Sequence, residues 1–276
     1  MAVKTRNKPF IIALEGIDGS GKSVQFARLR DRLSAEGFRT AVMDFPCYGS
    51  FFGSEIGRLL SGGGEDSALS VDARSMSLWY AMDRFAEFKK FDPDGIDVLL
   101  LNRSTMANAA YQGSRVHLKA EDSGDDPDAA TEAYVRWLFR LEFEELAIPE
   151  PDMFFIFDIP VGTSRKNVSK KGHREYVGGT RSDVYEKDTR LLAAVRAGYM
   201  TCARLFPGSV VLECTRADGN MRPIDDIAEE VWEKVAGRLG RAGQPDTAKA
   251  DTTDAAVKSG AEDINSLGKE VRQYND

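Results

Sequence analysis

The amino-acid sequence predicts an α/β fold in three layers, with a five-stranded parallel sheet flanked by helices. Within the first 240 residues, five short apolar segments alternate with longer amphipathic ones. Each apolar segment is continuously hydrophobic, which is typical of parallel strands buried on both faces. Strands joined by helices form right-handed crossovers, so helices should cover both faces of the sheet. The strands are expected at 10–15, 39–45, 97–102, 153–159 and 209–214.

The stretches between these strands carry the apolar spacing of helices. Residues 115–130 differ, because they are acidic and contain Gly124 and Pro127, and we expect a surface loop there. No internal repeat divides the chain, so one large α/β domain is expected. Its helices are expected near 22–36, 71–90, 131–147, 183–205 and 224–239.

Composition narrows the function classes. Hydrophobic residues make up 42% of the chain and charged residues 29%, an ordinary globular balance. The net charge of −7 disfavours non-specific binding to nucleic acid over a broad surface. No apolar run approaches the ~18 residues that cross a bilayer. The three cysteines, Cys47, Cys202 and Cys214, show no CxxC spacing. We therefore expect a cytoplasmic protein with neither a nucleic acid nor a membrane as its partner.

The last 36 residues have a different composition. Only Val257, Ile264, Leu267 and Val271 in 241–276 are Leu, Ile, Val or Phe. This proportion is below the ~20% content of these four residue types that a chain needs to form a hydrophobic core. We expect a polar, disordered tail there, and a folded domain over residues 1–240.

One motif carries explicit chemistry. Residues 16–23, GIDGSGKS, match the pattern GxxxxGK[ST] between an expected strand and an expected helix. Glycines let backbone N–H groups surround phosphate oxygens, while Lys22 reaches the β/γ phosphates and Ser23 can ligate Mg²⁺. A purely structural glycine turn is the alternative, which the strand–loop–helix context disfavours. A nucleoside triphosphate is expected to bind at Gly16, Asp18, Gly19, Ser20, Gly21, Lys22 and Ser23.

Further segments follow this loop in a fixed order. They are DFPCYGSFFGSEIGRLLSG, LWYAMDRFAEF, NRSTMANAAYQG, IPEPDMFFIFDIP and a stretch over 165–188 that ends in SDVYEKD. Together with LEGIDGSGKS, these segments resemble the thymidylate kinase family over about residues 9–240. The resemblance implies a P-loop kinase fold with a short lid at about 165–188. It also implies Mg²⁺-dependent transfer of the ATP γ-phosphate to dTMP, giving dTDP, and a homodimer.

The resemblance assigns the acceptor dTMP to two helices and the loop before the second. Tyr80 and Arg84 lie four residues apart on one helix face, so a base could stack on the ring beside the guanidinium. Asn108 offers both a donor and an acceptor to a pyrimidine edge, and Tyr111 can crowd the sugar. Arg103 follows the third strand, where it can hold a phosphate in a bidentate manner. Core packing and ordinary ion pairs are the alternatives from spacing alone. The expected dTMP-binding residues are Asp18, Tyr80, Arg84, Arg103, Asn108, Tyr111 and Gln112.

Positive charge for the transferred phosphate is expected from the lid. Positions 17–20 of the phosphate-binding loop contain no basic residue, whereas Lys166, Lys170, Lys171, His173, Arg174 and Arg181 lie in the lid segment. The resemblance makes Arg174 or Arg181 a catalytic candidate beside Lys22 and Arg103. A solvated charged surface is the alternative. Asp183 and Glu186 either fix the lid or cap the following helix.

Two positions depart from the family pattern. Asp44 stands where many members have an arginine before the Phe-Pro pair, which leaves acceptor-phosphate binding to Arg103 and Arg74. In the family the third strand usually ends in aspartate, whereas here it ends in Asn102. The expected ligands on the metal side are then the Ser23 hydroxyl and the Asn102 amide oxygen. Two rival functions stay open at this point. One is a deoxynucleoside kinase, with Glu15 or Asp18 as the base, and the other is a nucleotide-binding module with weakened catalysis.

Overall fold

The structure, a computed structural model, describes residues 8–62, 67–170 and 188–239. Each strand is followed by one or more helices, and the five strands come in the order that the sequence predicts. The elements are β1 (Phe10–Glu15), α1 (Lys22–Ala35), β2 (Thr40–Asp44), α2 (Phe51–Ser61), α3 (Ala73–Lys90), β3 (Val98–Asn102), α4 (Thr105–Ser123), α5 (Pro127–Phe139), the π-helix η2 (Arg140–Glu145), β4 (Met153–Asp158), α6 (Val161–Lys170), α7 (Thr189–Leu205), β5 (Ser209–Glu213) and α8 (Ile224–Leu239).

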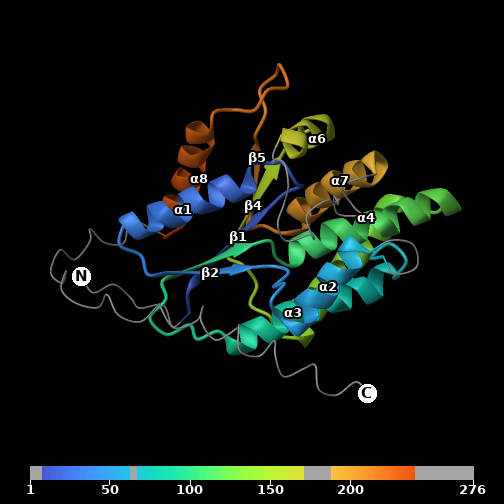
Figure 1. Cartoon of the computed structure of the whole chain (residues 1–276), viewed down its shortest axis with the longest axis horizontal. Coiled ribbons are helices and arrows are strands. Elements are labelled where there is room, and N and C mark those ends of the chain that lie inside the picture. The colour runs from blue at the N-terminus through green and yellow to red at the C-terminus, as the bar shows by residue number, and fades with distance from the viewer. Residues whose placement is uncertain (1–7, 63–66, 171–187, 240–276) are drawn as a thin grey trace, which may run out of the picture. The chain divides into compact units, whose positions relative to one another are not determined.

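The five strands form one parallel sheet in the order β2-β3-β1-β4-β5. In Figure 1, α1 and α8 lie together on one side of the sheet, and α2, α3, α4 and α7 lie on the other. The predicted three-layer fold with a five-stranded parallel sheet is therefore confirmed. Because all strands are parallel, their carboxyl ends meet at one edge, where ligands of open α/β sheets bind.

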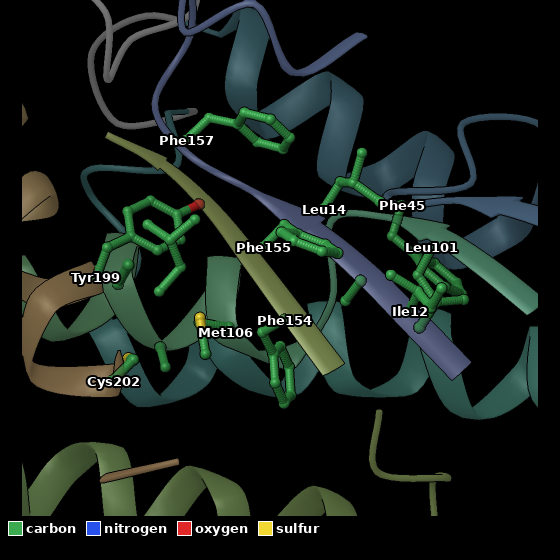
Figure 2. Close-up of a cluster of buried hydrophobic side chains, with 14 of the residues drawn as sticks. Ile12, Leu14, Phe45, Leu101, Met106, Phe154, Phe155, Phe157, Tyr199 and Cys202 are labelled. Carbon is green, nitrogen blue, oxygen red and sulfur yellow. The ribbon is translucent and has the colours of Figure 1, made fainter. Parts of the chain in front are cut away.

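The core is built on the three central strands. Every residue of β1 is buried, as are the first four of β3 and the first five of β4. Figure 2 shows Phe157 on one side of β4, and Phe154 with Met106 of α4 on the other. Successive side chains of a strand point to opposite faces, so β4 fills both helical layers with aromatic side chains. This rigid centre holds the loop that follows β1.

The expectation that all five strands are buried on both faces is wrong for the two outer ones. No residue of β2 is fully buried, and Leu212 is the one residue of β5 that is. Val42 is 50% exposed and Val211 is 44% exposed. Each outer strand has a neighbour on one side only, and the helical layers do not extend fully over it. Continuous apolar character in these strands therefore reflects β propensity as well as burial.

The expected surface loop over 115–130 is also wrong. Helix α4 continues to Ser123, and α5 begins at Pro127. Gly124 has a φ of +77°, and its N–H donates to the last turn of α4, so it is a helix-ending residue. Asp126 accepts hydrogen bonds from the first turn of α5, and Pro127 occupies the first position of that helix. The glycine and proline thus mark helix ends, and the loop is three residues long.

Two other helix boundaries differ from expectation. Helix α5 starts at Pro127 rather than 131 and passes directly into η2. Helix α7 starts at Thr189, and its cap is Asp188, which accepts from the N–H groups of Arg190 and Leu191. The described part of the expected lid is the end of α6 and Asp188. Residues 171–187 and the expected tail, 241–276, lie outside the described residues. Within the described part, no helix is long and apolar enough to span a membrane.

Candidate active site

The phosphate-binding loop connects the buried strand β1 to α1. Gly16, Gly19 and Gly21 have φ values of 141°, 77° and 90°, a region that side chains disfavour. A Cβ on Gly16 would lie 2.8 Å from the Phe157 carbonyl oxygen. Within the described residues, the buried Ser20 hydroxyl has no hydrogen-bond partner. The glycines of the motif are therefore required by geometry, and a buried polar group remains available at the loop.

Helix α6 holds this loop from the side, a contact that the sequence analysis did not anticipate. The Ser164 hydroxyl donates to the Asp18 carbonyl at 2.6 Å, and the Asn167 amide donates to the Gly19 carbonyl at 2.9 Å. Because a trans peptide is planar, a fixed carbonyl also fixes the next N–H in the opposite direction. Helix α6 therefore orients the N–H groups of Gly19 and Ser20. The spacing of Ser164 and Asn167, one helical turn, is the only sequence signal for this role.

Lys22 is the first residue of α1 and is only 6% exposed. Burial lowers the pKa of Lys22 to about 8, and the nearby Arg103 guanidinium acts in the same direction. Asp18, Glu15 and Asp44 oppose this shift. A buried ammonium without full compensation is costly, so the site is prepared for a strongly anionic ligand.

Arg103 links the phosphate-binding loop to α4. Its Nη2 lies 2.9 Å from the Asp18 Oδ1, and its guanidinium lies over the Tyr111 ring, 5.4 Å from the centroid. Its backbone N–H donates to the Leu14 carbonyl of β1, and its φ is +66°. Non-glycine residues rarely adopt that conformation. Three of the expected site residues, Asp18, Arg103 and Tyr111, are thus in direct contact.

Beneath Arg103 lies a buried carboxylate, Glu15, which ends β1. One Glu15 oxygen accepts from the Ser104 hydroxyl at 2.6 Å, and the other accepts from the Tyr199 hydroxyl at 3.3 Å. Burial raises the pKa of Glu15 above its ordinary value, while the Ser104 hydrogen bond opposes this shift. Tyr199 comes from α7, and Figure 2 shows its ring beside the central strands. No local pattern in the sequence pointed to Tyr199, because the contact joins residues 184 positions apart.

The two residues that depart from the family pattern pair with each other. Asp44 and Asn102 end β2 and β3 in register, and the Asn102 amide donates to the Asp44 carboxylate at 2.9 Å. Burial raises the pKa of Asp44, while this hydrogen bond and the charge of Lys22 oppose the shift. The Asn102 Oδ1 is buried and has no hydrogen-bond partner in the described part of the chain. A carboxylate is therefore present at this edge, on β2 instead of β3.

The expected base-binding residues Arg84 and Asn108 lie together in the interior, both in contact with Glu142 of η2. Glu142 was not anticipated, since RLEFEE has the composition of an exposed helix end. Tyr80 is partly buried on α3, one helical turn before Arg84.

Two further side chains from the sequence analysis have specific partners away from this cluster. The Gln112 side chain is buried and accepts from Arg115 at 2.8 Å. Arg74, an alternative phosphate ligand, stacks on the Trp137 ring at 4.5 Å. The lid candidates Arg174 and Arg181, together with Asp183 and Glu186, lie outside the described residues.

A parallel sheet with a phosphate-binding loop after β1, a buried lysine and an arginine after β3 defines a P-loop kinase. A family model described as thymidylate kinase matches residues 14–130. A thymidylate kinase of Mycobacterium tuberculosis is 31% identical over 196 residues, which cover 70% of this chain and 85% of the relative. The chain belongs to the thymidylate kinase family, and it is therefore a nucleoside monophosphate kinase.

Other similarities extend over most of the chain. A thymidylate kinase of Afipia carboxidovorans is 28% identical over 235 residues, covering 84% of this chain and 90% of that protein. The solved structure of the Candida albicans thymidylate kinase has a TM-score of 0.60 and 17% identity, covering 84% of this chain and 92% of that one. The structural likeness supports the fold, and the sequence relatives extend the match beyond residue 130.

Proposed function

We propose that this protein transfers the γ-phosphate of ATP to the 5′-phosphate of dTMP, giving dTDP and ADP. A dTMP phosphate oxygen forms the new bond to the γ-phosphorus, and the bond to the β–γ bridging oxygen breaks. The contact between Arg103 and Asp18 supports the proposal most, because the guanidinium that we assign to the acceptor phosphate lies against the loop that we assign to ATP. The chemistry is assigned to residues 1–240, with the tail outside it.

Catalysis in this proposal consists of positioning and charge neutralisation, with no covalent enzyme intermediate. Backbone N–H groups of residues 16–23 hold the donor phosphates, and Lys22 neutralises charge on the β/γ phosphates. Arg103 holds the acceptor phosphate in line. Arg174 or Arg181 contributes charge to the transferred group from the lid. Tyr80, Arg84, Asn108, Tyr111 and Gln112 select the base and the sugar.

The donor set at the sheet edge fits Mg²⁺. Ser23 is exposed in the first turn of α1. The Asn102 Nδ2 is bonded to the Asp44 carboxylate, and the buried Asn102 Oδ1 has no hydrogen-bond partner among the described residues. Among the described residues, no three His, Cys, Asp or Glu side chains form a metal-binding group. Mg²⁺ commonly takes one or two protein oxygens, with phosphates and water as its other ligands. When bound, it supplies charge neutralisation on the phosphates, and Ser23, Asp44 and Asn102 would hold it.

The geometry disfavours both rival functions. A nucleoside kinase needs a base that reaches a 5′-hydroxyl, but both Glu15 oxygens accept hydrogen bonds from Ser104 and Tyr199 in the interior. Asp18 is engaged by Arg103. A module that had lost catalysis would have little reason to keep Lys22 buried at a cost in stability.

A coupled assay of ADP release tests the proposal directly. ATP and Mg²⁺ are supplied with dTMP, dUMP, dCMP, thymidine or deoxycytidine as the acceptor. We expect dTMP to be the preferred acceptor and EDTA to stop the reaction. Preferred phosphorylation of a nucleoside would establish the first rival, and ATP binding without turnover of any acceptor would establish the second.

The homodimer is proposed on the exposed aromatic surface of α2 and α3. Phe51 is 69% exposed and Leu78 is 46% exposed. The Phe51 ring lies 5.3 Å from that of Phe52 and 6.5 Å from that of Trp79, centroid to centroid. Aromatic side chains gathered on one surface favour burial against another protein, and a second copy is the partner that the family implies. A cytoplasmic location is proposed as well, consistent with the free cysteines Cys47, Cys202 and Cys214.

Phe51→Glu is expected to convert the dimer into monomers, because a charge at the centre of an apolar interface is desolvated on association. Light scattering after size-exclusion chromatography measures the mass in solution. Val211→Glu is the matched control, since Val211 is an exposed apolar residue on β5, and we expect it to leave the mass unchanged. A monomeric wild-type protein, or a dimeric Phe51→Glu variant, would contradict this interface.

A further inference from the structure

Glu142 is a fully buried carboxylate that joins three helices. Its Oε1 accepts from Arg84 Nη2 at 2.5 Å and from Asn108 Nδ2 at 3.2 Å. Its Oε2 accepts from Arg84 Nε at 2.7 Å and from the Thr105 hydroxyl at 2.6 Å. Arg84 belongs to α3, whereas Thr105 and Asn108 belong to α4. Four donors satisfy the carboxylate, which offsets the cost of burying its charge.

The π-helix η2 brings this carboxylate to the interior. The Leu146 N–H donates to the Leu141 carbonyl, five residues earlier, and the Ile148 N–H donates to the Glu142 carbonyl. An extra residue in a turn shifts the side chains around the helix axis, and such turns often occur at functional sites. Glu142 is the one residue of η2 that is buried, while its neighbours remain at least partly exposed.

These contacts fix which way the Asn108 amide points. Its Nδ2 faces the Ser77 carbonyl at 3.1 Å and the Glu142 carboxylate, and both of these groups only accept hydrogen bonds. The NH₂ group must therefore lie on that side. The Asn108 Oδ1 accepts from the Ser77 hydroxyl at 3.0 Å. One lone pair of Oδ1 remains, so Asn108 can offer an acceptor and no further donor.

Arg84 has the complementary character. Its Nε and Nη2 are bonded to Glu142, and within the described residues Nη1 makes no hydrogen bond. Arg84 therefore offers a donor where Asn108 offers an acceptor. A pyrimidine with a carbonyl at C4 and an N–H at N3 matches this pair, as thymine and uracil do. Cytosine presents an amino group at C4 and an acceptor at N3, which is the reverse.

We infer that Glu142 is a positioning residue for base selection: it holds Arg84 as a donor and Asn108 as an acceptor, and so favours 4-oxo over 4-amino pyrimidine nucleotides. This role rests on the proposed function, because it takes Arg84 and Asn108 to face the acceptor base. Glu142 acts through those two side chains, and none of its hydrogen-bond partners is a residue that we assign to the phosphates. It should therefore affect acceptor binding and base preference more than the transfer step.

Glu142→Gln tests this role, because an amide replaces one acceptor oxygen by a donor that must face Arg84, Asn108 or Thr105. We expect the KM for dTMP to rise about tenfold or more, with kcat and the KM for ATP changed by less than about threefold. The preference for dTMP over dCMP, as a ratio of kcat/KM, should fall at least about tenfold. The preference for dTMP over dUMP should stay the same, since Glu142 does not act on the 5-methyl group.

Thr105→Val is the matched control, because it removes one donor to Glu142 and leaves Arg84 and Asn108 bonded; the dTMP/dCMP preference should not change. Glu142→Asp keeps the negative charge but moves it away from Arg84 by one methylene. It is the test variant if Glu142→Gln does not fold. A general loosening of the site would weaken the binding of dTMP and dCMP alike and leave the ratio of their kcat/KM values unchanged.

Melting curves identify the folded variants. A folded Glu142→Gln or Glu142→Asp variant with the wild-type dTMP/dCMP ratio would overturn the role of Glu142. Failure of the wild-type protein to phosphorylate dTMP would instead overturn the proposed function. The two failures are therefore separate results of one experiment.

Discussion

Replacing Lys22 with methionine is expected to lower kcat/KM by at least about a thousandfold, one of the two largest losses expected for a single side chain of the site. Methionine matches the length of the lysine stem but carries no charge for the β/γ phosphates. Loss of one hydrogen-bond donor aimed at developing negative charge typically costs about 10²–10³-fold, and in the proposed mechanism this lysine also binds the phosphates of ATP. Steady-state assays with saturating dTMP measure the change.

The same substitution is expected to stabilise the ligand-free protein. The pKa of Lys22 is lowered from 10.5 to about 8 in the folded state, so the unfolded chain holds this proton more tightly. The cost is fully present below pH 8 and disappears as the pH rises towards 10.5. Removing the charge should stabilise the protein by on the order of 3 kcal/mol at pH 7. Melting temperatures at pH 7, 9 and 10.5 should show a difference that shrinks at each step.

Lys22→Arg is the control for charge, since it keeps the cation and loses the lowered pKa. We expect partial activity from it, below wild type. A Lys22→Met protein with near-normal turnover would refute the role of Lys22. Equal melting temperatures for wild type and Lys22→Met at pH 7 would refute the proposed cost of its burial.

The second large effect is expected at Arg103. Arg103→Ala should lower kcat/KM for dTMP by about 10³-fold or more, because the acceptor phosphate loses its ligand and Asp18 loses its ion-pair partner. Arg103→Lys should recover part of this loss, since an ammonium supplies charge without a bidentate fork. The KM for ATP should change much less than the KM for dTMP.

Arg136→Ala is the control for the Arg103 variants. Arg136 is exposed and pairs with Glu132 within α5, and such surface pairs contribute little. It should leave both KM values unchanged. If Arg103→Ala raised the KM for ATP and dTMP equally, Arg103 would not be specific to the acceptor phosphate.

The central fold was predictable because each central strand carries its own signal. Residues 10–14 and 153–157 are apolar without interruption, and both belong to inner strands of the sheet. The outer strand at 39–45 has the same character for a different reason, so its exposure could not be predicted from the local pattern. The prediction of a loop at 115–130 failed for a similar reason. Gly124 and Pro127 mark a break between two helices, but the local sequence does not show how long the break is.

The candidate site also contains some residues that the local sequence could predict and others that it could not. Residues 16–23 could be predicted as a glycine-dependent loop between a strand and a helix, because the pattern places glycines and one lysine at fixed positions. Glu142, Tyr199 and Asn167 could not, because each contacts its partner across a long sequence separation and no local pattern distinguishes it from a packing residue. Tertiary structure alone brings these side chains to the site.

The left-handed backbone of Arg103 has a consequence for how this chain can be altered. A residue with a Cβ at φ +66° costs about 1 kcal/mol or more relative to glycine. Redesign for heat resistance that scores each position by backbone preference will replace this arginine with glycine or asparagine. The backbone strain would be relieved, but the guanidinium that we assign to the acceptor phosphate would be lost with its contact to Asp18. Position 103 should be kept fixed in any such redesign.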